Sequence, residues 1–220
     1  MSCISPLDKR FNLYLTELLK WNEKFNLTAI TDPVEIELKH FADSLALLDI
    51  FKLTTESVID LGTGAGFPGL PLKLVCPKIK LTLVEATGKK CQFLKQLVDL
   101  CKLTEVEIIN GRAEEVVKER REQFDLAVAR AVAEMRVLAE YALPFVKVGG
   151  TFVAYKEAAV EAEVAAAANA IKELGGRNVE IKKVALPNST LLRSLVVVAK
   201  TTPTPLKYPR RVGLAAKRPL

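Results

Sequence analysis

The apolar positions of the chain recur with two different periods, and this pattern divides it into helical and extended segments. In the first fifty residues the apolar side chains have helical spacing, which predicts one helix over residues 7–20 and another over residues 33–50. The second helix begins near Asp32 and Pro33, which suit a helix cap and a first helical turn. We therefore expect residues 1–52 to form an N-terminal helical extension that packs on the rest of the chain.

From residue 57 onward, short apolar runs alternate with amphipathic stretches, which is typical of a largely parallel sheet covered by helices. The runs predict strands over residues 58–61, 81–85, 106–110, 124–129, 151–155, 179–184 and 195–200. The stretches predict helices over residues 89–98, 114–122, 134–147 (closed by Gly149-Gly150) and 157–174. The last two strands are joined by a segment too short for a helical crossover, so we expect them to be antiparallel. Residues 53–205 are thus predicted to be an α/β core with a seven-stranded, mostly parallel sheet that ends in an antiparallel hairpin.

A cluster of glycines follows the first predicted strand of this core: Gly62, Gly64, Gly66 and Gly69. Glycine suits a tight turn from strand to helix, because it accepts positive φ and lets a ligand lie against the backbone. The spacing also satisfies the dinucleotide fingerprint, so the loop alone does not identify its ligand. Glu85 follows about twenty residues later, at the end of the next strand, where a ribose-binding acid is found in such folds. Together these features favour an adenosine-type ligand over an ordinary turn with a surface glutamate.

The composition is that of a globular protein of the cytoplasm. Half of the 220 residues are apolar, no apolar run approaches the roughly 20 residues of a membrane span, and the first residues do not resemble a signal peptide. Four cysteines without a CxxC pair, together with a single histidine, argue against a metal site and favour reduced, mostly buried thiols.

The positive charge is concentrated near the C-terminus. The net charge is +6, and the basic tail, residues 206–220, contains no acid and five basic residues: Lys207, Arg210, Arg211, Lys217 and Arg218. A local cluster of this kind suits a polyanion such as nucleic acid. Charge alone equally allows a solvated tail whose only effect is to keep the protein in solution.

Four side chains of the helical extension have two alternative roles each. Trp21 and Phe25 can stack on a base, although aromatic residues beside a helix more often anchor it to a core. His40 and Asp43 lie three residues apart on one helical face, where they can flank a substrate pocket. A single histidine is more often a packed or capping residue, so the roles of Trp21, His40 and Asp43 stay open.

Several segments, in a fixed order, resemble one known family. The glycine segment Val58-Ile59-Asp60-Leu61-Gly62-Thr63-Gly64-Ala65-Gly66-Phe67-Pro68-Gly69-Leu70-Pro71-Leu72 closely resembles that of the bacterial ribosomal RNA small-subunit methyltransferase G family, also called GidB. The resemblance extends to Trp21–Thr28, His40–Ser44, Val128–Ala131 and the ending Tyr208–Lys217, and so covers nearly the whole chain. It implies the Rossmann-like fold of class I S-adenosylmethionine-dependent methyltransferases.

The resemblance also implies an activity, a cofactor and a partner. The expected enzyme is cytoplasmic and transfers a methyl group from S-adenosylmethionine to N7 of one guanosine in 16S ribosomal RNA, given as naked RNA or as the 30S subunit. We expect it to work as a monomer, with no metal ion and no membrane contact. The implied cofactor contacts are Gly62, Phe67, Ala113, Glu114 and Arg130, to which the loop spacing adds Gly64 and Glu85. The five basic residues of the tail would hold RNA phosphates.

The chemistry of this acceptor limits what the site must contain. Guanine N7 carries a free lone pair, so no proton has to leave before attack, and positioning matters more than a general base. The fourth strand accordingly ends in Ala129-Arg130-Ala131-Val132, and not in the Asp/Asn-Pro-Pro-aromatic motif common in methyltransferases of exocyclic amines. Arg130 is the candidate positioning residue, through the cofactor carboxylate or guanine O6, and a structural salt bridge is its alternative role. The target base must be unpaired or extruded to enter the site.

Two other classes of function share part of this pattern. A nicotinamide-dependent oxidoreductase would have the same glycine loop and acid, but it explains neither the basic tail nor the terminal hairpin. A non-catalytic RNA-binding module would explain the tail, but an intact cofactor pocket argues against it.

Overall fold

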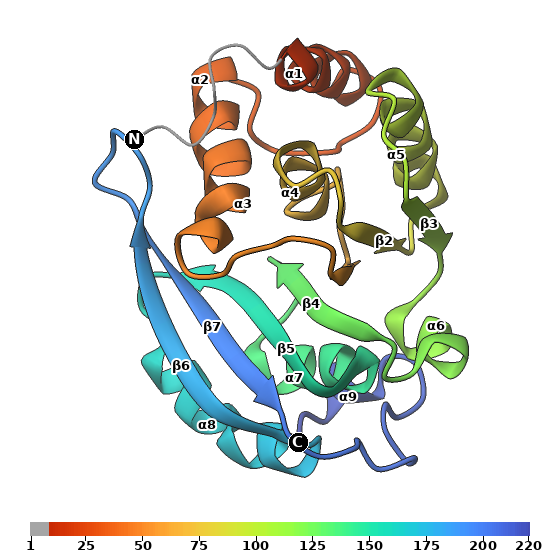
Figure 1. Cartoon of the computed structure of the whole chain (residues 1–220), viewed down its shortest axis with the longest axis vertical. Coiled ribbons are helices and arrows are strands. Elements are labelled where there is room, and N and C mark those ends of the chain that lie inside the picture. The colour runs from red at the N-terminus through yellow and green to blue at the C-terminus, as the bar shows by residue number, and fades with distance from the viewer. Residues whose placement is uncertain (1–8) are drawn as a thin grey trace.

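A seven-stranded sheet forms the centre of the computed structural model, which describes residues 9–220 (Figure 1). The strands are β1 (Ser57–Leu61), β2 (Lys80–Glu85), β3 (Val106–Asn110), β4 (Phe124–Arg130), β5 (Val146–Glu157), β6 (Gly176–Ala185) and β7 (Leu192–Lys200). Their order across the sheet is β3-β2-β1-β4-β5-β7-β6. Strands β1 to β5 are parallel, and β7 lies antiparallel between β5 and β6. The predicted mostly parallel sheet with a terminal antiparallel hairpin is confirmed.

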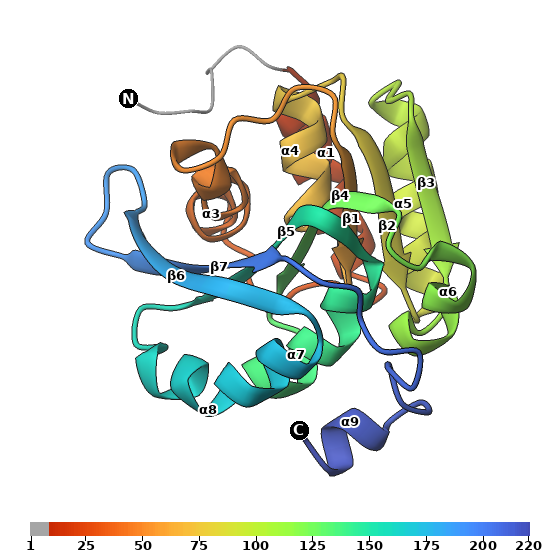
Figure 2. The same cartoon turned by 60° about the horizontal axis from the view of Figure 1, so that its bottom comes forward.

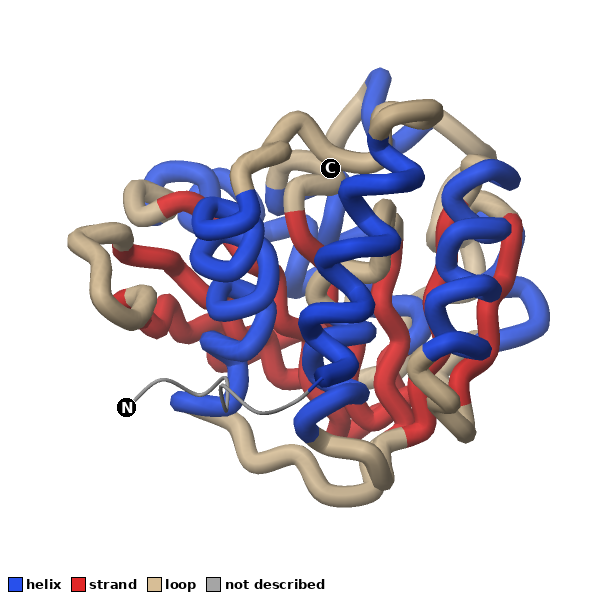
Figure 3. The backbone as a smooth tube through the Cα atoms, turned by 90° about the horizontal axis from the view of Figure 1, so that it is seen from above, coloured by secondary structure: helices blue, strands red, loops and turns tan. Residues whose placement is uncertain are grey.

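Helices cover both faces of this sheet (Figures 2 and 3). The helical segments are α1 (Lys9–Asn22), α2 (Pro33–Ile36), η1 (Glu37–Ala42), α3 (Asp43–Leu45), η2 (Ala46–Asp49), α4 (Gly69–Val75), α5 (Gly88–Leu100), α6 (Ala113–Arg120), α7 (Met135–Ala142), η3 (Leu143–Phe145), α8 (Glu161–Glu173) and α9 (Leu214–Lys217). Successive strand residues face opposite layers. In β1, Val58 packs in the core cluster that contains α1, α4 and α5, whereas Ile59 packs in the cluster that contains α7 and α8.

The helix predicted over residues 33–50 is one helical segment of changing pitch, not a uniform α-helix. It contains the π-helical turn η1 at Glu37–Ala42 and ends in the 3₁₀ turn η2. Carbonyl oxygens within η1 accept hydrogen bonds from the Arg130 side chain, at 3.1 Å for Lys39 and 3.5 Å for His40. A side chain that inserts into the carbonyl ladder of a helix is a known cause of local distortion.

Several predicted boundaries around β5 are wrong. The glycines expected to close the preceding helix lie inside β5. Gly149 has a φ of +89°, and a Cβ on Gly150 would lie 2.7 Å from the carbonyl oxygen of Asp125, so the pair allows β5 to pass close to β4 where the register shifts. Strands β5, β6 and β7 are longer than predicted, and the helix expected over 157–174 starts at Glu161.

The N-terminal extension packs into the same core as the sheet. Tyr14 and Leu18 of α1 are fully buried, and the Tyr14 hydroxyl donates a hydrogen bond to the carbonyl oxygen of Ala65 at 2.5 Å. The Tyr14 ring also stacks on Phe67, with ring centroids 5.2 Å apart. The extension therefore supports the glycine loop from one side. The predicted start of this helix, at residue 7, lies outside the described residues.

Residues 206–220, predicted as a tail, are also part of the folded body. The Tyr208 ring is buried, its hydroxyl donates a hydrogen bond to Glu173 at 2.7 Å, and Ala215 of α9 is buried as well. This segment lies along α6 and α7 at the lower edge of Figure 1. The basic residues of this segment therefore project from a backbone that is packed against the rest of the protein.

The described residues contain free thiols and no membrane-spanning helix. Cys76 and Cys91 are free, Cys91 and Cys101 are buried, and Cys3 lies outside the described residues. Within residues 9–220, no helix is both long and apolar enough to cross a membrane, and no three His, Cys, Asp or Glu side chains group together in a way that could hold a metal ion.

Candidate active site

The loop between β1 and α4 turns through glycines with positive φ. The φ values are +64° at Gly62, +62° at Gly64 and +100° at Gly66. A Cβ on Gly64 would have only the carbonyl oxygen of Gly62 within reach, at 4.0 Å, so open space lies beside this part of the backbone. A ligand can therefore approach the backbone at Gly64 more closely than at any residue with a side chain.

Protein oxygens already satisfy the first N–H groups of this loop. The N–H groups of Gly62 and Thr63 donate to the carbonyl oxygen of Val84 at 2.9 and 3.2 Å. The Gly64 N–H donates to Oε2 of Glu85 at 3.0 Å. In a phosphate-binding loop such groups point at the ligand instead. The loop offers a close approach lined by a carboxylate, which does not suit a pyrophosphate.

Glu85 lies at the carboxyl end of β2, next to the glycine loop, where the spacing predicted it. The residue is 7% exposed, and its second oxygen, Oε1, accepts the Thr87 N–H at 2.8 Å. Its backbone carbonyl accepts hydrogen bonds from Asn110 Nδ2 at 2.9 Å and Gly111 N–H at 3.1 Å, which join it to the loop after β3. Each carboxylate oxygen keeps a further lone pair for a ligand hydroxyl.

Ala113 and Glu114 begin α6, after the β3 loop. Glu114 is buried, and its Oε1 accepts the N–H of Gly213 in the C-terminal segment at 3.0 Å. Gly213 has a φ of +75°, and α9 begins at the next residue. The structure therefore joins the acid expected at the adenine end of the site to the segment that carries the basic residues.

Asp60, a buried carboxylate in β1, is a residue that the motif argument passed over. Its Oδ2 accepts hydrogen bonds from the Thr63 hydroxyl at 2.6 Å and from the Gly69 N–H at 2.8 Å, which ties both ends of the glycine loop to the strand. Its Oδ1 has no hydrogen-bond partner within residues 9–220. Burial raises the pKa of Asp60 to about 6. A carboxylate inside an apolar strand was the sequence signal that marks it.

Asp60→Asn is expected to change the pH dependence of stability between about pH 4 and 6. Because the pKa of Asp60 is raised from 3.8 to about 6 on folding, the folded protein binds more protons than the unfolded chain in this window. Stability therefore falls as the pH rises through it, by at most about 3 kcal/mol, and asparagine removes this loss. Urea unfolding at several pH values should show that the free energy of unfolding of the variant, relative to that of the parent, rises up to pH 6 and is constant above it. A difference in the free energy of unfolding between variant and parent that stays constant across this pH range would contradict the assignment.

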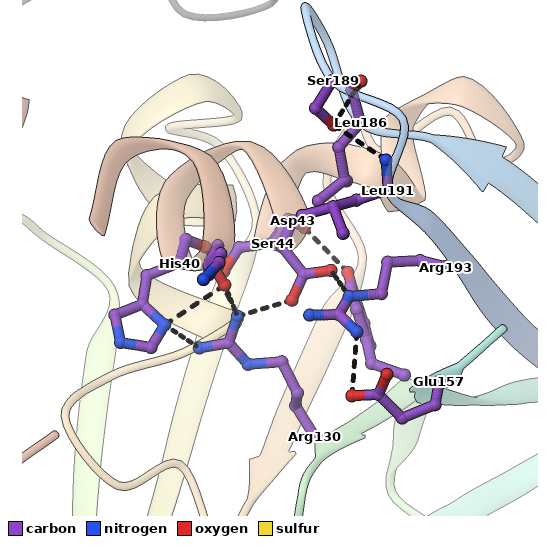
Figure 4. A network of polar contacts seen from close by, with 11 residues as sticks. His40, Asp43, Ser44, Arg130, Glu157, Leu186, Ser189, Leu191 and Arg193 are labelled. Atoms are coloured by element: carbon purple, nitrogen blue, oxygen red, sulfur yellow. Dashed lines mark hydrogen bonds and ion pairs between the residues drawn. The ribbon is translucent and has the colours of Figure 1, made fainter. Parts of the chain in front are cut away.

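Arg130, at the carboxyl end of β4, reaches across to the helical extension (Figure 4). Its Nη1 donates to Oδ2 of Asp43 at 2.7 Å, and its Nη2 lies 3.3 Å from Nδ1 of His40. The guanidinium carbon lies 4.9 Å from the ring centroid of Phe67, in the glycine loop. The structure thus brings together Arg130 and Phe67, two of the residues predicted to contact the cofactor.

His40 is held in place as a neutral side chain. Burial and the charge of Arg130 lower the pKa of His40 to about 4. Its Nε2 lies 2.7 Å from the hydroxyl of Thr28, and its ring stacks on Phe67 at a centroid distance of 4.6 Å. At neutral pH the imidazole therefore has no charge, and polar groups engage both of its nitrogens.

Asp43 joins two arginines that are far apart in the sequence. It is 2% exposed, and its Oδ1 accepts a hydrogen bond from Nε of Arg193 at 2.8 Å while Oδ2 binds Arg130. Arg193 stands in β7, directly opposite Glu157 of β5, and its Nη1 donates to Oε1 of Glu157 at 3.0 Å. The resulting row of charged side chains runs from Arg130 to Glu157 (Figure 4).

A cavity of about 440 Å³ opens beside this row, at the carboxyl ends of β4 and β5. Its walls include His40, Asp43, Arg130, Tyr155, Glu157 and Arg193. The volume lies within the range of small-molecule sites, roughly 300–1,000 Å³. In doubly wound α/β sheets this end of the strands is the usual place for ligands.

The segment between β4 and α7 covers part of the glycine loop. A Cβ on Gly62 would lie 2.8 Å from Cγ2 of Val132, so the Val132 side chain sits directly over Gly62. Lys156 Nζ holds this segment by donating to the carbonyl oxygen of Ala133 at 2.6 Å.

Comparison with known proteins decides the family to which these features belong. Residues 8–192 match the family described as rRNA small subunit methyltransferase G. The chain belongs to this family. The ribosomal RNA small subunit methyltransferase G of Alkaliphilus metalliredigens (strain QYMF) is 50% identical over 210 residues, which cover 94% of this chain and 88% of that relative. The resemblance inferred from the sequence and the assignment as an rRNA methyltransferase are confirmed.

Solved structures agree with the fold of this family member. A putative methyltransferase of Haloferax volcanii, solved in complex with a methyltransferase activator, aligns with a TM-score of 0.62 at 16% identity over 84% of this chain and 98% of that one. TYW2 of M. jannaschii, solved in complex with AdoMet, aligns with a TM-score of 0.53 at 20% identity over 66% and 68% of the two chains. At such identities the likeness shows the fold, and the predicted class I methyltransferase fold is confirmed.

The five basic residues near the C-terminus are not equivalent in this rRNA methyltransferase. Lys207 pairs with Glu173 at 3.0 Å on the surface. Arg210, one of the five residues predicted to hold RNA phosphates, binds the fully buried Glu140 of α7, with 2.6 Å between Nη2 and Oε2. The other three side chains are exposed: Arg211, Lys217 and Arg218.

The aromatic pair of the extension packs against α5. Trp21 lies edge-on to Phe93, with centroids 5.7 Å apart, and 5.5 Å from Phe25. Lys89 Nζ lies 4.7 Å from the centroid of Phe25. These contacts match the anchoring role that was one of the two alternatives for this pair.

Proposed function

We propose that the chain transfers a methyl group from S-adenosylmethionine to N7 of a guanosine in 16S ribosomal RNA, as a monomer in the cytoplasm. The observation that supports this most strongly is the pairing of two adjacent sites at one end of the sheet. The open backbone of Gly64 beside Glu85 suits the adenosine part of the donor. The cavity beyond Arg130 suits a separate planar acceptor.

The residues of the first site fit this donor. The carboxylate of Glu85 suits the ribose hydroxyls, and Ala113 and Glu114 would flank the adenine. Asp60 and Glu85 also make the loop anionic, which disfavours the pyrophosphate of a nicotinamide cofactor and favours a cation. When bound, S-adenosylmethionine supplies an electrophilic methyl group on a positively charged sulfonium. We assign the remaining contacts to Gly62, Gly64 and Phe67. Arg130, whose guanidinium lies over the Phe67 ring, has two alternative roles, one at the cofactor carboxylate and one at the acceptor.

The second site suits an acceptor that needs no deprotonation. His40 is neutral with both nitrogens engaged, and Asp43 is tied to two guanidinium groups, so neither is free to act as a general base. Guanine N7 attacks with its own lone pair, so what the chain must supply is orientation. The guanidinium of Arg130 can give it by donating to O6, the acceptor next to N7.

The basic residues near the C-terminus would hold the RNA. Arg211, Lys217 and Arg218 are exposed and, with Lys207, can contact phosphates, whereas Arg210 is already paired with Glu140. Because Glu114 binds Gly213 in the same segment, RNA held here would lie near the adenine end of the donor site.

Glu85→Ala is expected to raise the Kd for S-adenosylhomocysteine about 10- to 100-fold, because each hydrogen bond to a charged group contributes about 1.5–3 kcal/mol. Calorimetry measures this Kd, and transfer of labelled methyl to 16S RNA, given naked and in the 30S particle, measures activity. Digestion should yield N7-methylguanosine. The exposed Glu115→Ala is the matched control. Transfer to neither substrate, with cofactor binding intact, would refute the proposed acceptor and leave the donor site standing.

A further inference from the structure

One wall of the cavity beyond Arg130 is a row of charged side chains that can form hydrogen bonds with a ligand. That wall is the row Arg130, Asp43, Arg193 and Glu157, drawn in Figure 4. It comes from four different elements, β4, α3, β7 and β5. Within it, donors and acceptors alternate in a fixed order.

Asp43 makes this wall rigid. It is 2% exposed and has one arginine on each carboxylate oxygen, Arg130 at 2.7 Å and Arg193 at 2.8 Å. A carboxylate that is both buried and doubly paired fixes the two guanidinium groups relative to each other, because moving either one would leave a buried charge uncompensated. The positions of Arg130 and Arg193 are therefore coupled.

Glu157 is the member of the wall that remains available to a ligand. Its side chain is 88% exposed, and Arg193 Nη1 is its one hydrogen-bond partner within residues 9–220, at 3.0 Å to Oε1. The antiparallel register of β5 and β7 places the two residues directly opposite each other. Arg193 thus holds the carboxylate at the rim of the cavity while Oε2 can still accept hydrogen bonds.

The two ends of the wall are complementary to one edge of guanine, while Asp43 and Arg193 between them are paired with each other. Starting beside the glycine loop, the wall presents a donor at Arg130 and, at its far end, an acceptor at Glu157. Guanine presents acceptors at N7 and O6, followed by donors at N1–H and N2–H₂. Adenine has the opposite pattern beyond N7, with a donor at N6 and an acceptor at N1. A guanine with O6 at Arg130 would turn N7 toward the donor site.

We propose that Glu157, held by Arg193 and Asp43, recognises the N1–H and N2–H₂ groups of the acceptor guanine in this cavity. Glu157 is then a specificity-determining residue, and Arg193 is a positioning residue that acts through it. This inference rests on the proposed function, since it takes guanosine N7 as the acceptor.

The test compares guanosine with inosine at the modified position. Inosine keeps N7, O6 and N1–H but lacks the N2 amino group, so the parent enzyme should show a kcat/KM at least about 10-fold higher for guanosine. Glu157→Ala should reduce this ratio below about 3-fold, mainly by slowing the reaction of guanosine. Glu180→Ala, which removes an exposed ion-paired glutamate outside the cavity, should keep the parent ratio.

Arg193 is tested by two variants. Arg193→Ala should also lower the ratio, and Arg193→Lys, which keeps a positive charge between the two carboxylates, should restore part of it. The Kd for S-adenosylhomocysteine should stay within about 3-fold of the parent value in each variant, since a general loss of structure would raise it.

Two results would overturn the inference. An unchanged ratio in Glu157→Ala would show that this carboxylate does not touch the base. An unchanged ratio in Arg193→Ala, with a Kd for S-adenosylhomocysteine raised 10-fold or more, would assign the cavity to the amino-acid end of the cofactor. Failure of the parent enzyme to methylate guanosine at N7 is a separate result, which refutes the proposed function itself.

Discussion

Arg210→Ala is expected to lower the free energy of unfolding by about 3–5 kcal/mol, the cost of leaving one partner of a buried ion pair alone. The Glu140 side chain has no exposed surface. Its Oε1 accepts the backbone N–H of Arg210 at 2.8 Å and Nε at 2.9 Å, and its Oε2 accepts Nη2 at 2.6 Å. Removal of the guanidinium leaves a buried carboxylate with a single backbone donor.

The neighbouring arginine supplies the control for this prediction. Arg211 is exposed, so Arg211→Ala should change the free energy of unfolding by no more than about 0.5 kcal/mol. Glu140→Gln should lower the free energy of unfolding less than Arg210→Ala does, because Arg210 is 22% exposed and its guanidinium can turn toward water. Urea unfolding at neutral pH measures all three variants. Equal losses for Arg210→Ala and Arg211→Ala would show that the ion pair does not hold the C-terminal segment in place.

The parts of the site that depend on local spacing were predictable from the sequence. The glycine loop and Glu85 are fixed by the path of one strand, one helix and the next parallel strand. The register pairs Leu61 with Val84, and this brings the ends of the two strands together. Any chain with this βαβ pattern places a loop and an acid side by side, so their proximity follows from topology alone.

The acceptor cavity was not predictable, because it depends on contacts between distant parts of the chain. Asp43 and Arg193 are separated by 150 positions, and they meet only when the β5–β7 register sets Arg193 opposite Glu157. A slip of one residue in that register would turn Arg193 to the other face of the sheet. No feature of the sequence around Arg193 marks it, since an arginine near the start of a strand is common on solvent-exposed surfaces.

The roles of the basic residues near the C-terminus also depend on contacts between distant parts of the chain. Their charge was visible in the sequence, but the burial of Glu140 was not, because an acid in an amphipathic helix is normally placed on the solvent side. Only the packing of residues 206–220 on α7 shows that Arg210 neutralises a buried carboxylate while Arg211 faces solvent. Adjacent arginines therefore have different roles, one in stability and the other open to a polyanion.

Arg130→Ala is expected to lower kcat/KM for RNA methylation by at least about 10²-fold, the scale of loss when a positioning contact is misplaced by about 1 Å. The Arg130 side chain binds Asp43 at 2.7 Å and the carbonyl oxygen of Lys39 at 3.1 Å, and it covers Phe67. Without it, the donor site and the acceptor cavity lose the group that fixes their relative position.

Arg130→Lys and the Kd for S-adenosylhomocysteine distinguish the possible roles of Arg130. Lysine keeps the charge, but it cannot form the branched set of contacts to Asp43 and His40, so we expect an intermediate loss of activity. Arg136→Ala, which removes a half-buried arginine that does not line the cavity, should leave activity unchanged. A Kd for S-adenosylhomocysteine raised 10-fold or more in Arg130→Ala would assign the guanidinium to the cofactor carboxylate, and a change below about 3-fold would assign it to guanine O6. Activity within about 10-fold of the parent, in folded protein, would mean that Arg130 serves only as a structural ion pair, because both positioning roles require the larger loss.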